Sequence, residues 1–77
     1  MNGTGAESLH GAIAEAHACG NHSVLTTLYQ QAAYLTEQQS DIDACCFHLT
    51  QALVYALESG HPDEPFIRQR LSRYSRI

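Results

Sequence analysis

Apolar residues recur along most of the chain at intervals of three and four positions, which is the spacing of one buried face of an α-helix. The pattern predicts helices over about residues 5–19, 23–38, 41–59 and 64–74, and no strand. Because the connections between them are short, neighbouring helices should lie antiparallel. The sequence therefore predicts one all-α domain over residues 1–77, made of four short helices.

Residues that favour helix ends flank these segments. Thr4 with Glu7, and Ser40 with Asp43, have the spacing of a capping box, in which two side chains bind the backbone at the start of a helix. Gly60 suits the end of the third predicted helix, because glycine adopts the left-handed conformation of a helix C-terminus without strain. We therefore expect the helix ends close to these residues.

The segment over 41–59 is apolar on more than one side. Its main stripe, at steps of three and four residues, consists of Ile42, Cys45, Cys46, Leu49, Ala52, Leu53 and Ala56. Phe47, Val54 and Leu57 extend the apolar surface to a second side. A helix with so little polar circumference packs between neighbours, so we expect both cysteines of the main stripe in the core.

Composition and charge narrow the class of protein. Residues 1–64 hold all eight acidic residues and no lysine or arginine, while residues 65–77 hold all four arginines. The net charge of −4 argues against a nucleic-acid-binding domain. Three cysteines do not make an even disulfide framework, and no apolar run approaches the ~20 residues that span a bilayer. We therefore expect a cytoplasmic protein without a membrane partner.

Histidine and cysteine residues form two candidate sites for chemistry. Residues 45–48 read CCFH, but successive side chains on a helix diverge by about 100°, so these groups cannot readily share one metal ion. His17, Cys19 and His22 gather around the end of the first predicted helix, where soft ligands could bind zinc or copper. Their spacing matches no standard metal site. A small metal- or redox-responsive helical protein that uses these three residues is the alternative function.

Catalytic signatures are absent from the sequence. It contains no G-x-S-x-G, no H-E-x-x-H and no glycine-rich phosphate loop. We therefore expect a protein that is not an enzyme and that needs neither a cofactor nor a metal ion.

The arginine-rich end of the chain is a candidate contact surface. Arg70 and Arg73 can line one face of the last predicted helix, with Tyr74 nearby. Basic residues in a last turn complement the helix dipole, and they can also attract the acidic body of the same chain or of a second copy. We assign these three residues as candidate contacts to a second copy or to a phosphate group. Nucleic acid is not the expected partner, because the remainder of the chain is acidic.

A further pattern spans residues 27–52. Its positions are Tyr29, Ala32, Ala33 and Thr36 in one predicted helix, the turn SDID, and Cys45, Leu49 and Ala52 in the next. At these spacings the segment resembles a tetratricopeptide repeat, a unit of 34 residues built from two antiparallel helices. Ala18 precedes Ala52 by one such period, so the first predicted helix resembles the second helix of a preceding repeat.

The resemblance implies a function as well as a fold. In this family the first helix of each repeat lines a concave groove that holds a peptide. The corresponding positions here are Thr27, Gln30, Tyr34 and Glu37. Family members that clamp a peptide carboxylate use lysines and asparagines there, and this chain has no lysine, so that subclass does not fit. We expect a non-catalytic protein–protein interaction module. A plain four-helix bundle is the alternative architecture.

The chain is also expected to associate with itself. Repeat units rarely bury their apolar faces alone, and this chain has at most two hairpins. The apolar residues that look exposed near its end are Leu71, Tyr74 and Ile77. Apolar surface left after folding favours an interface, so we expect a homodimer, with Arg70 and Arg73 of one chain facing acidic residues of the other.

Overall fold

The computed structural model describes residues 5–75 as four α-helices. They are α1 (Gly5–Cys19), α2 (His22–Gln38), α3 (Ile42–Ser59) and α4 (Glu64–Arg73). No strand occurs between residues 5 and 75, so the predicted all-α fold is confirmed. Thr4, Glu7, Arg76 and Ile77 lie outside the residues whose side chains the structure describes.

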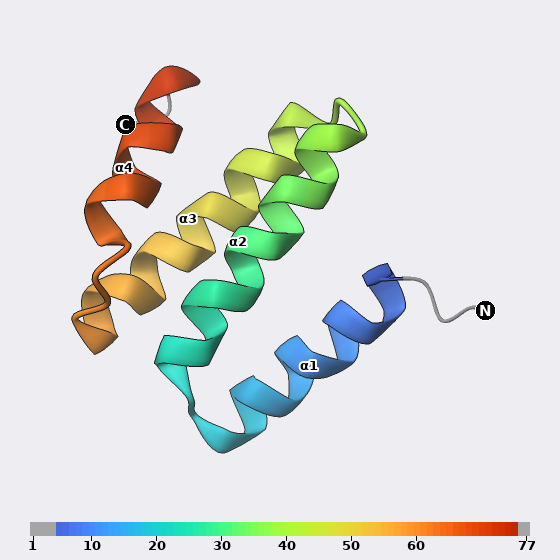
Figure 1. The fold of residues 1–77 in the computed structure, drawn as a ribbon, viewed down its shortest axis with the longest axis vertical. Helices are drawn as coiled ribbons and strands as arrows, with labels where there is room; N and C mark the ends of the chain where they lie inside the picture. The colour runs from blue at the N-terminus through green and yellow to red at the C-terminus, as the bar shows by residue number, and fades with distance from the viewer. Residues whose placement is uncertain (1–4, 76–77) are drawn as a thin grey trace.

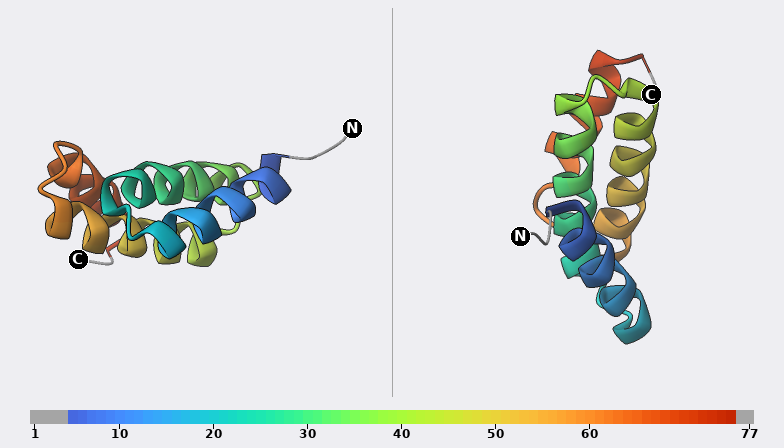
Figure 2. Two further views of the ribbon diagram at one scale, coloured as in Figure 1. Left: turned by 90° about the horizontal axis from the view of Figure 1, so that it is seen from below. Right: turned by 90° about the vertical axis from the view of Figure 1, so that its right-hand side faces the viewer.

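The helices form an open row in chain order (Figure 1). α2 and α3 make a central antiparallel hairpin, with α1 on one side of it and α4 on the other. Each helix packs against the next one in the sequence, and the molecule measures 36 × 29 × 15 Å. Further views show that α1 crosses the hairpin obliquely (Figure 2). The shape is therefore a thin slab with long stretches of helix surface facing solvent.

Short polar side chains begin the two central helices. Asn21 Oδ1 accepts a hydrogen bond from the backbone N–H of Val24 at 3.2 Å, and Asp41 Oδ1 accepts one from Ala44 at 3.1 Å. Both satisfy a backbone donor that has no partner within the helix. The predicted capping role of Ser40 is wrong, because Ser40 adopts a left-handed conformation with φ of 61° in the turn and Asp41 takes the cap position.

Gly60 ends α3 in the left-handed conformation that the sequence predicted, with φ of 64°. Replacement by alanine places no atom within 4 Å of the new Cβ, so the cost is backbone strain alone. Gly60→Ala should lower the free energy of unfolding by about 1 kcal/mol. Gly11→Ala, at an equally open position inside α1, should raise it by up to about 1 kcal/mol. Urea unfolding of both variants checks this, and changes of the same sign would contradict it.

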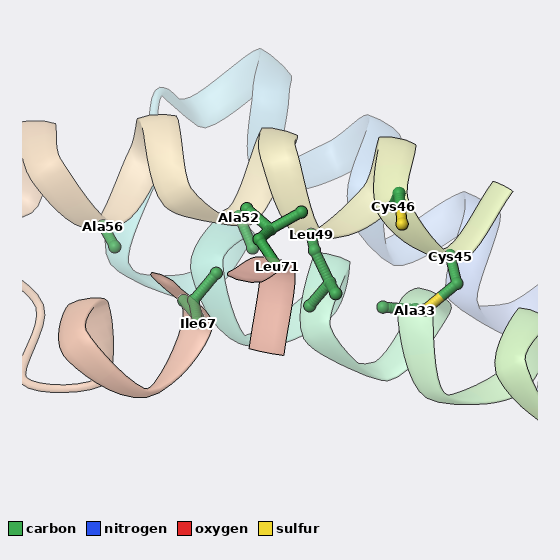
Figure 3. Packing of buried hydrophobic residues seen from close by; sticks show 8 residues of the cluster. All are labelled: Ala33, Cys45, Cys46, Leu49, Ala52, Ala56, Ile67 and Leu71. Atoms are coloured by element: carbon green, nitrogen blue, oxygen red, sulfur yellow. The ribbon is translucent and has the colours of Figure 1, made fainter. Parts of the chain in front are cut away.

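One cluster of buried side chains joins α2, α3 and α4 (Figure 3). Its members are Ala33, Cys45, Cys46, Leu49, Ala52, Ala56, Ile67 and Leu71. Most are small, which lets the helices approach one another closely. The two cysteines are buried, as the stripe in the sequence predicted, and each is a free thiol. The core therefore centres on the inner face of α3.

Leu71 belongs to this core, so its predicted exposure is wrong. It is only 1% exposed, because α4 turns Ile67 and Leu71, one helical turn apart, toward α3. α4 is thus a packed element of the fold. Between residues 5 and 75, no helix combines the length and the hydropathy needed to cross a membrane.

Candidate functional site

A groove with a volume of about 520 Å³ runs along the exposed side of α2. Its lining residues are Leu9, Thr27, Gln30, Gln31, Tyr34, Leu35 and Asp63. Leu9 comes from α1 and Asp63 immediately precedes α4, so the groove forms where three segments of the chain meet. Thr27, Gln30 and Tyr34 are three of the four positions that the repeat resemblance assigned to a peptide.

Side-chain contacts tie α2 to the α4 region. Gln30 Nε2 donates a hydrogen bond to Asp63 Oδ2 at 3.0 Å, and Arg70 Nη2 lies 3.5 Å from Glu37 Oε1. Both contacts join residues 33 positions apart, so α4 runs in the same direction as α2 at a constant offset. In Figure 1 α2 and α4 rise in the same direction, with α3 running between them.

Glu37, the fourth predicted groove position, does not line the groove. Its carboxylate accepts a hydrogen bond from the Tyr74 hydroxyl and pairs with Arg70. The hydrogen bond to Glu37 is the main reason that the pKa of Tyr74 is raised above its usual value. Glu37 therefore anchors the end of α4 within the chain.

The predicted contact residues at the end of the chain separate into two groups. Arg70 and Tyr74 bind Glu37 of the same chain, and the Arg70 side chain is largely buried. Arg73 is exposed and makes no ion pair with any residue between 5 and 75. The predicted attraction between the arginines and the acidic body thus operates within one chain at Arg70.

A cluster of aromatic rings, some stacked and some edge to face, lies at the junction between α1, α2 and α3. Its members are His17, His22, Tyr29, His48 and Tyr55. The Tyr29 and Tyr55 rings lie nearly parallel, with centroids 5.9 Å apart, and His17 Nε2 lies 3.0 Å from the Tyr29 hydroxyl. Burial, with a smaller effect from Tyr55, raises the pKa of Tyr29, so its protonated hydroxyl can donate to His17. This ring cluster holds the C-terminal half of α1 against the hairpin.

His17, Cys19 and His22, the candidate metal ligands from the sequence, do not converge on one point in the structure. His17 contacts Tyr29, while His22 Nδ1 lies 3.1 Å from Glu58 Oε1, and Cys19 is exposed. Over the described part of the chain, no group of three or more histidine, cysteine, aspartate or glutamate side chains could hold a metal ion. These histidines instead serve the ring cluster.

His48 makes the stability of the fold depend on pH. Burial, followed by the charge on His10, holds the pKa of His48 below its usual value of about 6.5, although Asp41 opposes this. The unfolded chain therefore takes up this proton at a higher pH than the folded chain does. The stability that neutral His48 contributes is complete above about pH 6.5 and is lost as the pH falls toward the lower folded value.

Urea unfolding at about pH 7.5 and about pH 5 tests this dependence. The wild-type chain should lose more stability on acidification than His48→Gln, which has no proton to take up at this position. An equal loss in both proteins would show that His48 does not cause the dependence.

Sequence reasoning missed the other half of the groove. Leu9, Gln31, Leu35 and Asp63 come from α1, from α2 outside the repeat positions, and from the turn before α4. Their meeting depends on the oblique angle of α1, for which the sequence pattern contains no signal. Leu9 was the one available clue, because an apolar residue in an amphipathic helix is expected to pack against a neighbouring element; in the structure it is buried.

The groove offers binding groups of several kinds. Gln30, Gln31 and Thr27 present amides and a hydroxyl, Leu9 and Leu35 present apolar surface, and Asp63 presents a carboxylate. Such a mixture of apolar walls and a few polar groups is typical of ligand-binding clefts. Comparison of the chain with family models, with curated proteins and with solved structures finds no match.

Proposed function

We propose that this chain is a non-catalytic protein–protein interaction module of the helical-repeat type, which holds a segment of a partner protein in the groove along α2. The observation that carries this proposal is that Thr27, Gln30 and Tyr34 all line the groove of about 520 Å³. These residues were assigned to peptide binding by the repeat resemblance, and their convergence on one cavity supports that assignment.

The arrangement of the helices also supports a repeat. α4 follows α2 at an offset of 33 residues, as Gln30 with Asp63 and Glu37 with Arg70 show, and the tetratricopeptide unit is 34 residues long. In this view α4 is the first helix of a second unit. An open row of helices in chain order is the architecture that repeat proteins use to create extended binding surfaces.

The chemistry of the groove suits an extended peptide. Gln31 and Thr27 are exposed and can meet the N–H and C=O groups of a peptide backbone. Tyr34 is 55% exposed and lines the same groove, and exposed tyrosines are frequent anchors of protein interfaces because they bring large contact area at low entropic cost. The partner segment would therefore lie across Tyr34 with its backbone against the polar side chains.

A library of displayed random peptides, screened with the full chain, tests the proposal. Peptides that bind should lose affinity by about tenfold or more in Tyr34→Ala, because interface tyrosines often contribute that much. Phe66→Ala is the matched control, since Phe66 is 52% exposed and does not line the groove. Peptides that bind both variants equally, or a library that enriches none, would overturn the proposal.

Self-association is a second proposal, and it rests on a different surface. Phe47, Val54 and Leu57 lie at steps of seven and three residues on α3, so they share one face, and all three are exposed. Exposed apolar side chains that gather on one face of a helix favour an interface. The dimer contact through α4 that the sequence predicted is less favoured, because Leu71 is buried and Arg70 already pairs with Glu37.

Sedimentation over a range of protein concentrations tests this second proposal. The wild-type chain should dimerise, and a double variant with Phe47→Ser and Leu57→Ser should stay monomeric while keeping its helicity. A wild-type chain that remains monomeric at every concentration would contradict it.

A further inference from the structure

We infer that the groove selects a partner segment that carries a positively charged side chain, which the Asp63 carboxylate recognises. This inference rests on the proposed function, because it names the chemistry of the peptide that the groove would hold. It begins from the position of Asp63, the charged residue in the groove lining.

Asp63 does not act as an ordinary helix cap. It occupies the N-cap position of α4, where an aspartate usually accepts a hydrogen bond from the first turn, yet its side chain makes no such bond. Its Oδ2 atom instead accepts a hydrogen bond from Gln30 Nε2 at 3.0 Å. The carboxylate is therefore held toward α2, beside the groove, and is kept out of its usual structural role.

The cationic groups nearest in sequence do not neutralise this carboxylate. His61 Nδ1 lies 3.9 Å from Asp63 Oδ2, but this nitrogen accepts the backbone N–H of Asp63 at 3.1 Å, so its lone pair is occupied. Arg68 pairs with Glu64, and Arg70 pairs with Glu37. Between residues 5 and 75, Asp63 makes no ion pair with an arginine, and its side chain is 49% exposed, so a ligand can reach it.

The remaining lining suits a long cationic side chain. Leu9 and Leu35 provide apolar surface for the methylene stem of an arginine or lysine, which packs well on such surface while its charged end stays polar. The exposed ring of Tyr34 adds a face that attracts a cation. A cavity of about 520 Å³ has room for such a side chain and part of the adjoining peptide.

The experiment uses the tightest peptide from the displayed library and a copy in which each arginine is replaced by citrulline, which has the same shape without the charge. Enriched peptides should contain arginine or lysine more often than the starting library does. The citrulline copy should bind the wild-type chain about fivefold more weakly, which is the scale of a partly exposed ion pair.

Asp63→Asn should remove this difference, because asparagine can still accept the hydrogen bond from Gln30. The matched control is Glu15→Gln, which removes one negative charge from the exposed side of α1, away from the groove, and should preserve the difference. Circular dichroism of both variants confirms that the fold is kept.

Failure of this inference and failure of the proposed function give different results. Peptides that depend on Tyr34 but bind equally well with arginine or citrulline would overturn the inference and leave the function standing. The inference also fails if citrulline weakens binding equally in the wild type and in Asp63→Asn, because another residue would then recognise the charge. A library that enriches no peptide overturns both.

Discussion

Replacement of Cys45 by aspartate is expected to unfold the protein. Cys45 is 0% exposed, and in Figure 3 its sulfur points toward Ala33 on the neighbouring helix. An ionised carboxylate at this position would lose its hydration without gaining a partner, at a cost of several kcal/mol, which is comparable to the whole stability of a small domain. Cys45→Ala removes little volume and should cost about 1 kcal/mol.

Circular dichroism and urea unfolding distinguish these outcomes. Phe47→Asp is the matched control, because Phe47 lies on the same helix but is 58% exposed, and this variant should keep its helicity. A folded Cys45→Asp protein would contradict the packing described for α3.

Burial is also the main cause that raises the pKa of the Cys45 thiol, so thiol reagents should modify Cys45 slowly in the native state.

Removal of the Leu71 side chain should cost about 2–5 kcal/mol, because the cavity that a buried leucine leaves is only partly filled by its neighbours. Leu71 is 1% exposed and packs in the cluster that joins α2, α3 and α4. A loss of this size would show that α4 belongs to the cooperative fold. Thermal or urea unfolding of Leu71→Ala gives the value directly.

Phe66→Ala provides the comparison on the same helix. Phe66 is half exposed, and the Arg70 guanidinium carbon lies 6.0 Å from the centroid of its ring. A contact of this kind contributes at most about 1 kcal/mol at an exposed position. Equal losses for Leu71→Ala and Phe66→Ala would contradict the burial pattern of α4.

The helices could be predicted well because their signals are local. The stripe that contains Cys45 and Leu49, and the glycine that ends α3, depend on residues only a few positions apart. The start of α3 was harder to place, because Ser40 and Asp41 are both good caps and only the backbone conformation of the turn decides between them. The predicted cap of α3 was therefore one residue too early, whereas the helix itself was predicted correctly.

Contacts between distant helices set the limit of what the sequence revealed. Leu71 was expected on the surface because helix periodicity alone does not say which face of α4 meets α3. The groove positions on α2 could be inferred from the repeat resemblance, whereas Leu9 and Asp63 reach the groove only through the oblique packing of α1 and the path of the chain before α4. The same holds for the contact of Glu37 with Arg70.

The ring cluster is another contact between helices that the sequence did not reveal. His17 and His22 drew attention as metal ligands because they lie close together in the sequence. Their partners, Tyr29 and Tyr55, lie on α2 and α3. Aromatic residues on the polar side of a helix were the available signal, since a tyrosine there often packs against a neighbouring helix through its ring.

Amide chemical shifts of the labelled chain, recorded during titration with a peptide from the library, test the central claim most directly. Binding in the groove should shift the amides of Thr27, Gln31 and Tyr34 on α2, together with Leu9 on α1, and leave the middle of α3 around Val54 unchanged. Shifts centred on Phe47, Val54 and Leu57 with none along α2 would contradict the account, because the peptide would then occupy the exposed apolar face of α3.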